Sequence, residues 1–218
     1  MHIVISIPAI EDFPKGVPHF WLNRMFIGSV TGDPQVNALS TTFVRLVESA
    51  LIDYRQAREA VFEFWADSGF PLGIMHLAIS RYEACVSDMS RAVRCFRRLR
   101  RHESLPEELR MALNVVRPRF VADQIYERLS NLRNEVQHLE DHIINGKIEP
   151  TQTFTLRPDG PEEPHPTDSG QTVKTVDRLR IGGQELLISD LAIWLVEMAV
   201  FAGKIADHRP AGGTGAKS

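Results

Sequence analysis

The sequence has only two cysteines and no long uninterrupted apolar segment. Cys85 and Cys95 lie in one predicted helix, about 15 Å apart along its axis, so a disulfide between them is excluded and we expect free, partly buried thiols. The longest apolar stretch, 186–202, is interrupted by Asp190 and Glu197 and is too short to cross a bilayer. The first residues lack the charged start and apolar core of a signal peptide. We therefore expect a cytoplasmic protein without a membrane span.

Lysine is also scarce. The 25 basic residues are mostly arginine, and lysine stands only at Lys15, Lys147, Lys174, Lys204 and Lys217. The net charge of −3 excludes a polycationic field over the whole molecule that would attract nucleic acid. Arginine offers a planar fork that suits phosphate and carboxylate, although a biased genomic composition gives the same excess.

Apolar residues recur at helical spacing over most of the chain. Asp33-Pro34 predicts a helix N-cap followed by proline at the first helical position, and Ser104 with Glu107 has the spacing of a capping box. Asn145-Gly146 predicts a helix end. The expected helices span residues 34–68, 71–99, 104–117, 120–143 and 191–206.

The remaining segments predict a small β part and several loops. Alternation of polar and apolar residues predicts a strand over 2–7, and a hairpin is expected from 173–181 and 185–188 around Gly182-Gly183. The other expectations are an irregular segment over 8–32, a β-like run over 151–156, an exposed flexible loop over 157–170 and a disordered tail over 209–218. The fold prediction is one mainly α domain over 1–208, a helical bundle with a small β-hairpin appendage.

One short motif points to chemistry. Arg133, Asn134 and His138 lie in the expected helix 120–143, with four residues between the arginine and the histidine. This pattern, late in a long helix, resembles the signature of HEPN-family ribonucleases. The resemblance implies a helical bundle that forms a homodimer and cleaves RNA without a metal or other cofactor. It further implies partners that include RNA and, for members in toxin–antitoxin or defence systems, an antitoxin-like protein.

The resemblance also implies a role for each motif residue. An imidazole can both accept and donate a proton near neutral pH, and His138 would take a proton from a ribose 2′-hydroxyl or return one to the leaving oxygen. Arg133 would hold the phosphate bidentately, and Asn134 would position the phosphate or the imidazole. Arg133 and His138 are about 140° apart around an ideal helix, so one helix alone cannot easily aim both at one atom, whereas two copies of the helix that meet face to face could do so.

Structural alternatives exist for the same residues. Arg133 and Asn134 can be solvated surface groups, and His138 can lie at the bundle edge beside a carboxylate. The fold without nuclease activity would then be a helical module that binds nucleotide, RNA or a protein. Glu135-x-x-His138 is half of a di-iron pattern without a second half, and zinc on His138 and His142 is the remaining metal alternative.

A second candidate is a stripe of arginines at the end of the helix 71–99. The stripe members recur at i, i+3, i+7 and i+10 and would suit an RNA phosphate backbone: Arg91, Arg94, Arg98 and Arg101. The alternative is a solvated helix face that is favourably basic near its C-terminus. Arg97 and His102 repeat the motif spacing, but they lack the asparagine and lie at a helix end, so we treat that pair as coincidence.

Overall fold

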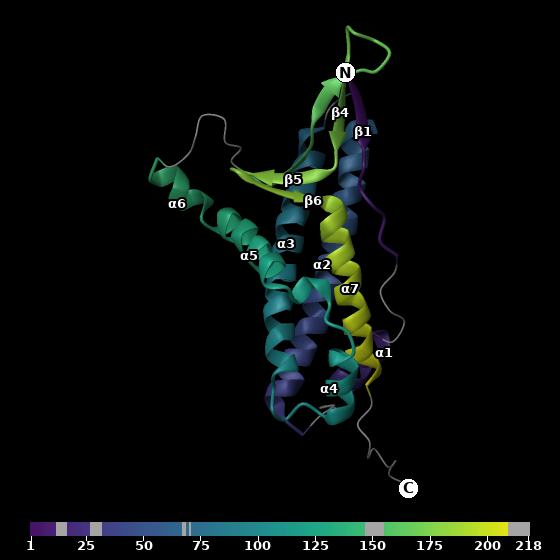
Figure 1. Ribbon diagram of the computed structural model, residues 1–218, viewed down its shortest axis with the longest axis vertical. Helices are drawn as coiled ribbons and strands as arrows, with labels where there is room; N and C mark the ends of the chain where they lie inside the picture. The colour runs from purple at the N-terminus through teal and green to yellow at the C-terminus, as the bar shows by residue number, and fades with distance from the viewer. Residues whose placement is uncertain (12–16, 27–31, 67–68, 70, 147–154, 209–218) are drawn as a thin grey trace.

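The computed structural model describes residues 1–11, 17–26, 32–66, 69, 71–146 and 155–208 (Figure 1). The described residues are mainly helical, with 66% helix and about 13% strand, which confirms the predicted fold class. The helices are α1 (Val17–Phe26), α2 (Pro34–Ala66), α3 (Leu72–Arg100), α4 (Glu107–Asn114), α5 (Asp123–Gln137), α6 (Leu139–Ile144) and α7 (Ile188–Asp207), with a 3-10 turn η1 (Arg119–Val121). The strands are β1 (His2–Ile5), β2 (Arg157–Asp159), β3 (Glu162–Pro164), β4 (Thr172–Val176), β5 (Arg178–Ile181) and β6 (Gln184–Leu187).

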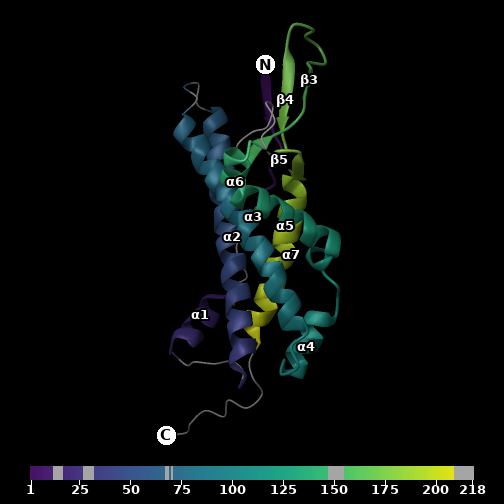
Figure 2. The ribbon, with the colours of Figure 1, turned by 90° about the vertical axis from the view of Figure 1, so that its left-hand side faces the viewer.

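The long helices α2 and α3 run side by side, and α7 packs along α2 (Figures 1 and 2). The start of α2 is the predicted cap, because the Asp33 carboxylate accepts hydrogen bonds from the N–H groups of Gln35 (2.7 Å) and Val36 (3.1 Å). The predicted capping box is wrong, since α4 begins after Pro106 without a side-chain cap. Cys85 is buried and Cys95 partly buried, and both are free, as predicted.

Four phenylalanines join the bundle to the segment before α5. Phe96 of α3 lies at their centre, with ring centroids 5.0 Å from Phe43 of α2, 5.0 Å from Phe120 of η1 and 5.1 Å from Phe201 of α7. All four rings are buried. Edge-to-face packing of this kind adds to the stabilisation from burial, so η1 and the first turn of α5 are fixed to the bundle.

The β part consists of two three-stranded sheets, β1-β4-β3 and β2-β5-β6. The predicted hairpin is confirmed, with β5 and β6 antiparallel and Gly182 at φ +52° in the turn. The expected strand 173–181 is divided at Asp177 into β4 and β5, which belong to different sheets. The N-terminal strand pairs in parallel with β4, a long-range contact that alternation alone does not specify.

Residues 161–170 are mostly exposed, as the loop prediction expected. The prediction of a flexible loop is wrong for 157–164, because this segment contains β2 and β3, and Pro158, Asp159 and Gly160 are buried. Its prolines suit the short strands because β2 and β3 each have only one paired neighbour in their sheets. Gly160 lies so close to β4 that a Cβ atom built there would be 1.6 Å from the Thr175 carbonyl oxygen.

Three other expectations need correction or fall outside the described residues. Part of 8–32 forms the helix α1 rather than an irregular segment, and α1 packs on α7. Helix α7 begins at Ile188 rather than 191, and the face that carries Ile193, Val196 and Val200 is exposed rather than buried. The expected tail 209–218 and most of the run 151–156 lie outside the described residues.

Candidate functional site

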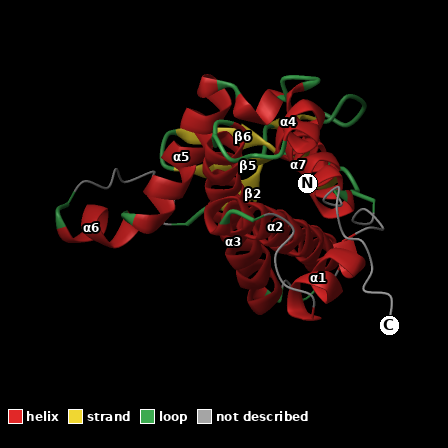
Figure 3. Ribbon diagram, turned by 90° about the horizontal axis from the view of Figure 1, so that it is seen from below, coloured by secondary structure: helices red, strands yellow, loops and turns green. Residues whose placement is uncertain are grey.

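The predicted helix 120–143 is not continuous. Residue Ala122 is extended (φ −61°, ψ 142°) between η1 and α5, and His138 (φ −100°, ψ 11°) separates α5 from α6. The first half of α5 packs on α3, whereas its end and α6 project away from the bundle (Figures 1 and 3). The motif histidine therefore lies at a junction of two helices and not within one.

We call the end of α5 together with α6 the projecting arm. The apolar side chains become more exposed from α5 toward the end of this arm. Leu129 and Leu132 are fully buried, but Val136 is only half-buried, and Ile143 and Ile144 are 48% and 80% exposed. The apolar stripe thus serves as core in the first half of the predicted helix, and beyond His138 it has little bundle surface to pack on. The end predicted at Asn145-Gly146 is confirmed, with Gly146 at φ +63°.

The three motif residues differ in their surroundings. Arg133 is half-buried, and its Nε atom is buried without a hydrogen-bond partner among the described residues. Asn134 is exposed on the next position around the helix. His138 is 58% exposed, and its Nδ1 atom lies 3.1 Å from a carboxylate oxygen of Asp141. The structure brings these residues to one helix end, but it does not bring Arg133 and His138 onto one face.

Asp141 also meets the structural alternative, in which His138 lies at the bundle edge beside a carboxylate; the sequence analysis did not name this residue, although its i+3 spacing from His138 was a visible signal. In the tautomer with the proton on Nδ1, the ring donates to Asp141 and Nε2 keeps its lone pair. No hydrogen bond or ion pair from a described residue reaches that Nε2 atom. The carboxylate would orient the ring, as an acid–base histidine requires.

The carboxylate and histidines that were considered for metal binding do not converge. Glu135 lies 3.6 Å from Nδ1 of His142, while His138 is turned to Asp141. Over the part of the chain that the structure describes, no three His, Cys, Asp or Glu side chains are placed to hold a metal ion. Glu135 and His142 are therefore explained as a second carboxylate–imidazole pair beside the motif.

The arginine stripe is exposed along α3, as its spacing predicted. All four members reach solvent: Arg91, Arg94, Arg98 and Arg101. Arg91 forms an ion pair with Asp88 at 3.3 Å, and no ion pair is found for the other three within the described ranges. Three unpaired guanidinium groups on one helix face make a surface suited to phosphate.

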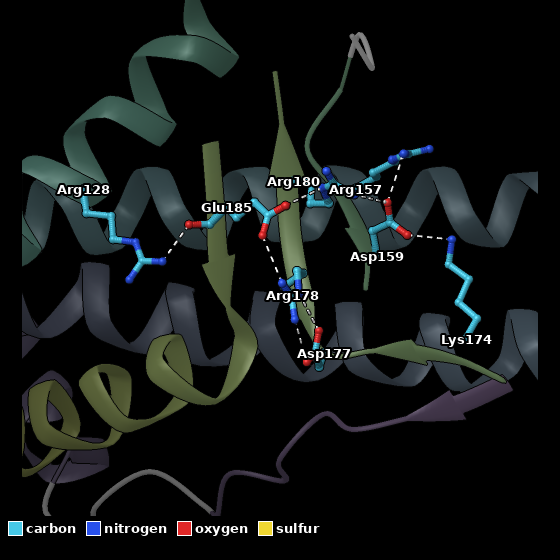
Figure 4. A network of polar contacts seen from close by, with 8 residues as sticks. All are labelled: Arg128, Arg157, Asp159, Lys174, Asp177, Arg178, Arg180 and Glu185. Carbon is cyan, nitrogen blue, oxygen red and sulfur yellow. Dashed lines mark hydrogen bonds and ion pairs between the residues drawn. The ribbon is translucent and has the colours of Figure 1, made fainter. Parts of the chain in front are cut away.

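A separate polar network covers the β part (Figure 4). We call the eight residues of Figure 4 the β network: Arg128, Arg157, Asp159, Lys174, Asp177, Arg178, Arg180 and Glu185. Buried Asp159 lies 2.7 Å from Lys174, 3.0 Å from Arg157 and 3.5 Å from Arg180. Glu185 pairs with Arg178 at 3.0 Å and with Arg180 at 2.9 Å.

These contacts change the pKa values of the groups in the β network. Burial alone would raise the pKa of Asp159, but hydrogen bonds from Lys174 and the Gly160 N–H, with the charge of Arg157, outweigh it and lower the pKa. Asp177 and then Glu185 raise the pKa of Arg178. Because each cation here already has a carboxylate partner, we interpret the β network as structural.

None of the helices over the described residues is long and apolar enough to cross a membrane. Comparison with known proteins gives no relative. No protein-family model matches the sequence, and neither a curated protein nor a solved structure matches the chain.

Proposed function

We propose that the protein is a metal-independent endoribonuclease of HEPN type that acts as a homodimer through Arg133, Asn134 and His138. The observation that carries the proposal is the exposed His138 ring with Asp141 at 3.1 Å on Nδ1. That pair leaves Nε2 available to a substrate and has the chemistry of a general base. Arg133 lies five positions earlier, with a buried Nε atom that lacks a partner among the described residues.

The reaction that fits these groups is an intramolecular transesterification of RNA. Nε2 of His138 takes the proton of the ribose 2′-hydroxyl, and the 2′ oxygen attacks the adjacent phosphorus. The bond from phosphorus to the 5′ oxygen breaks, and that oxygen takes a proton from His138 of the second copy in its protonated form. Arg133 stabilises the charge on the phosphoryl oxygens, and the products are a 2′,3′-cyclic phosphate and a 5′-hydroxyl.

Two features support a dimer at the projecting arm. Arg133 and His138 are about 140° apart around an ideal helix, so a second copy would have to complete the site. The arm also offers apolar side chains that a partner would bury, since Ile143 and Ile144 are exposed and Val136 is half-buried.

The test is cleavage of a mixed single-stranded RNA pool with and without EDTA, with the product ends analysed for 2′,3′-cyclic phosphate. His138→Ala should lower the rate at least about 100-fold because it removes the proton carrier. Arg133→Lys should also be severely impaired, since lysine keeps the charge but loses the bidentate fork. EDTA should have no effect on the wild type.

The matched control is His142→Ala, one turn from His138 and paired with Glu135. This variant should retain cleavage and the dimer. Persistent cleavage by His138→Ala would contradict the acid–base role, and loss of activity in EDTA or in His142→Ala would favour the zinc alternative. A strictly monomeric particle in light scattering at micromolar concentration would contradict the composite site.

The second candidate function is a non-catalytic module that binds RNA. The exposed stripe on α3 favours it, because Arg94, Arg98 and Arg101 carry no counter-charge from the described residues. Wild-type protein that binds the RNA pool with a steep salt dependence, but yields no cyclic phosphate ends, would establish the binding module in place of the nuclease.

A further inference from the structure

A pocket of about 430 Å³ lies where the end of α3 meets the end of α4 and the start of α5. We call it the arginine pocket, and its lining residues are Arg97, Arg100, Arg101, Asn114, Arg117, Val121 and Asp123. Its volume is within the range of about 300–1,000 Å³ that is usual for small-molecule sites. Only Arg101 belongs to the predicted stripe, and no spacing in the sequence predicts that Arg117 lies beside it.

The charges in the arginine pocket are not balanced from within. Four guanidinium groups face one carboxylate, Asp123, whose side chain is 78% exposed. Within the described ranges neither Arg101 nor Arg117 has an ion pair. Burial, and then the charges of Arg117 and Arg101, lower the pKa of Arg100. Like charges therefore repel in this pocket, and an anion would relieve that repulsion.

Two of the four arginines are held in position by neutral or acidic partners. Arg97 donates to the Val121 carbonyl (2.6 Å), pairs with Asp123 (2.9 Å) and stacks 4.4 Å from the ring centroid of Tyr126. Arg100 donates through Nε and one terminal nitrogen to the Asn114 amide oxygen, at 2.8 and 2.6 Å.

That arrangement leaves the second terminal nitrogen of Arg100 without a partner among the described residues. A ligand would therefore meet guanidinium groups whose orientation is largely set before it binds.

We propose that the arginine pocket binds an oligophosphate group, carried by a free nucleotide or by the 5′ end of an RNA. Four guanidinium groups exceed what the single charge of a phosphodiester needs, and the planar forks of arginine match phosphoryl oxygens. The pocket is distinct from the motif, because Asp123 begins α5 and Arg133 follows about 15 Å further along the helix axis. The inference does not depend on nuclease activity.

The experiment is isothermal titration calorimetry of the full chain with sodium tripolyphosphate, ATP, orthophosphate, and one short RNA carrying either a 5′-triphosphate or a 5′-hydroxyl. Arg101→Gln and Arg117→Gln should each weaken tripolyphosphate binding about tenfold or more. Arg45→Gln is the matched control, an exposed arginine of α2 that removes the same charge outside the pocket and should leave affinity unchanged. Circular dichroism checks that each variant is folded.

The ATP and RNA titrations distinguish the two sources of the oligophosphate group. Tight binding of ATP assigns a free nucleotide, whereas preference for the 5′-triphosphate RNA over ATP assigns an RNA end. Three results would overturn the proposal: no binding of tripolyphosphate by the wild type, equal weakening by Arg45→Gln, or no binding of ATP together with equal affinity for the 5′-hydroxyl and 5′-triphosphate RNA. The last result would assign the pocket to the phosphodiester backbone.

Discussion

Two arginine-rich regions of this molecule differ in how their charge is balanced. In the β network every cation lies near a carboxylate: buried Asp159 contacts Lys174, Arg157 and Arg180, Arg178 pairs with Glu185 (Figure 4), and Arg128 lies 3.7 Å from Asp190. In the arginine pocket Arg101 and Arg117 have no such partner within the described ranges. Internal counter-charges favour a structural role, whereas their absence around a pocket favours an external anion.

The comparison predicts that loss of a charged group changes the free energy of unfolding in opposite directions in the two regions. Removal of the central carboxylate from the β network should destabilise the fold, because Arg157 and Lys174 lose their carboxylate partner and Arg180 keeps only Glu185. Removal of a cation from the arginine pocket should not destabilise it. The following predictions use the free energy of unfolding, measured with urea, to test this difference and the packing on which the β network depends.

Gly160→Ala should have the largest effect, a loss of more than about 3 kcal/mol. The added Cβ would meet the Thr175 carbonyl oxygen at 1.6 Å, and β4 cannot move away because β1 and β3 pair with it on both sides. Gly183→Ala is the control, since no atom lies within 4 Å of a Cβ there. Equal stability of the two variants would show that Gly160 has more room than the structure gives it.

Asp159→Asn should cost about 2 kcal/mol, less than a fully buried pair because Arg157 and Arg180 are 44% and 41% exposed. Glu163→Gln, an exposed neighbour on β3, should be close to neutral. Comparable losses of stability in the two variants would mean that a negative charge anywhere in this region stabilises the fold, and that the specific contacts of Asp159 do not.

The same carboxylate predicts a pH dependence. Its pKa is lowered in the folded protein from an ordinary value of 3.8, so its stabilisation is present above that value and is lost as the pH falls through the lower, folded pKa. The difference between wild type and Asp159→Asn should therefore shrink below about pH 4. A difference that stays constant between pH 7 and pH 3 would contradict this linkage.

Arg117→Gln should have the smallest effect and the opposite sign, an increase of less than about 1 kcal/mol at low salt. The substitution relieves repulsion with Arg100, and added salt should remove the gain. Arg45→Gln provides the reference for loss of an arginine elsewhere. Destabilisation by Arg117→Gln would place this residue with the β network as a structural group.

The sequence predicted the helices best where burial and periodicity coincide. Helices α2 and α3 could be predicted from their apolar spacing, and the start of α2 from the Asp33 cap, because local hydrogen bonds and one buried face specify a helix. The segment 157–170 was missed because its prolines and polar residues resemble a loop. Only the long-range pairing of β2 with β5 and of β3 with β4 makes it a pair of strands.

The candidate sites show the same division. The residues of the motif and the stripe were visible as spacings, since i, i+3 and i+4 neighbours share a helix face. The helix break at His138 was not visible, because the apolar stripe continues through Leu139 and Ile143 while the bundle surface beneath it does not. Asp141 is a candidate site residue because the tertiary structure turns the ring of His138 toward its carboxylate.

The sequence by itself determined the mainly α fold, the free thiols and the positions of the arginines along α3, all of which follow from local periodicity and spacing. Tertiary structure alone decided which arginines lack counter-charges. Arg117 follows α4 in the chain, and it reaches Arg100 because the turn after α3 brings α4 back beside it. Charge balance depends on distance in space, and spacing along the chain does not specify that distance beyond one helix.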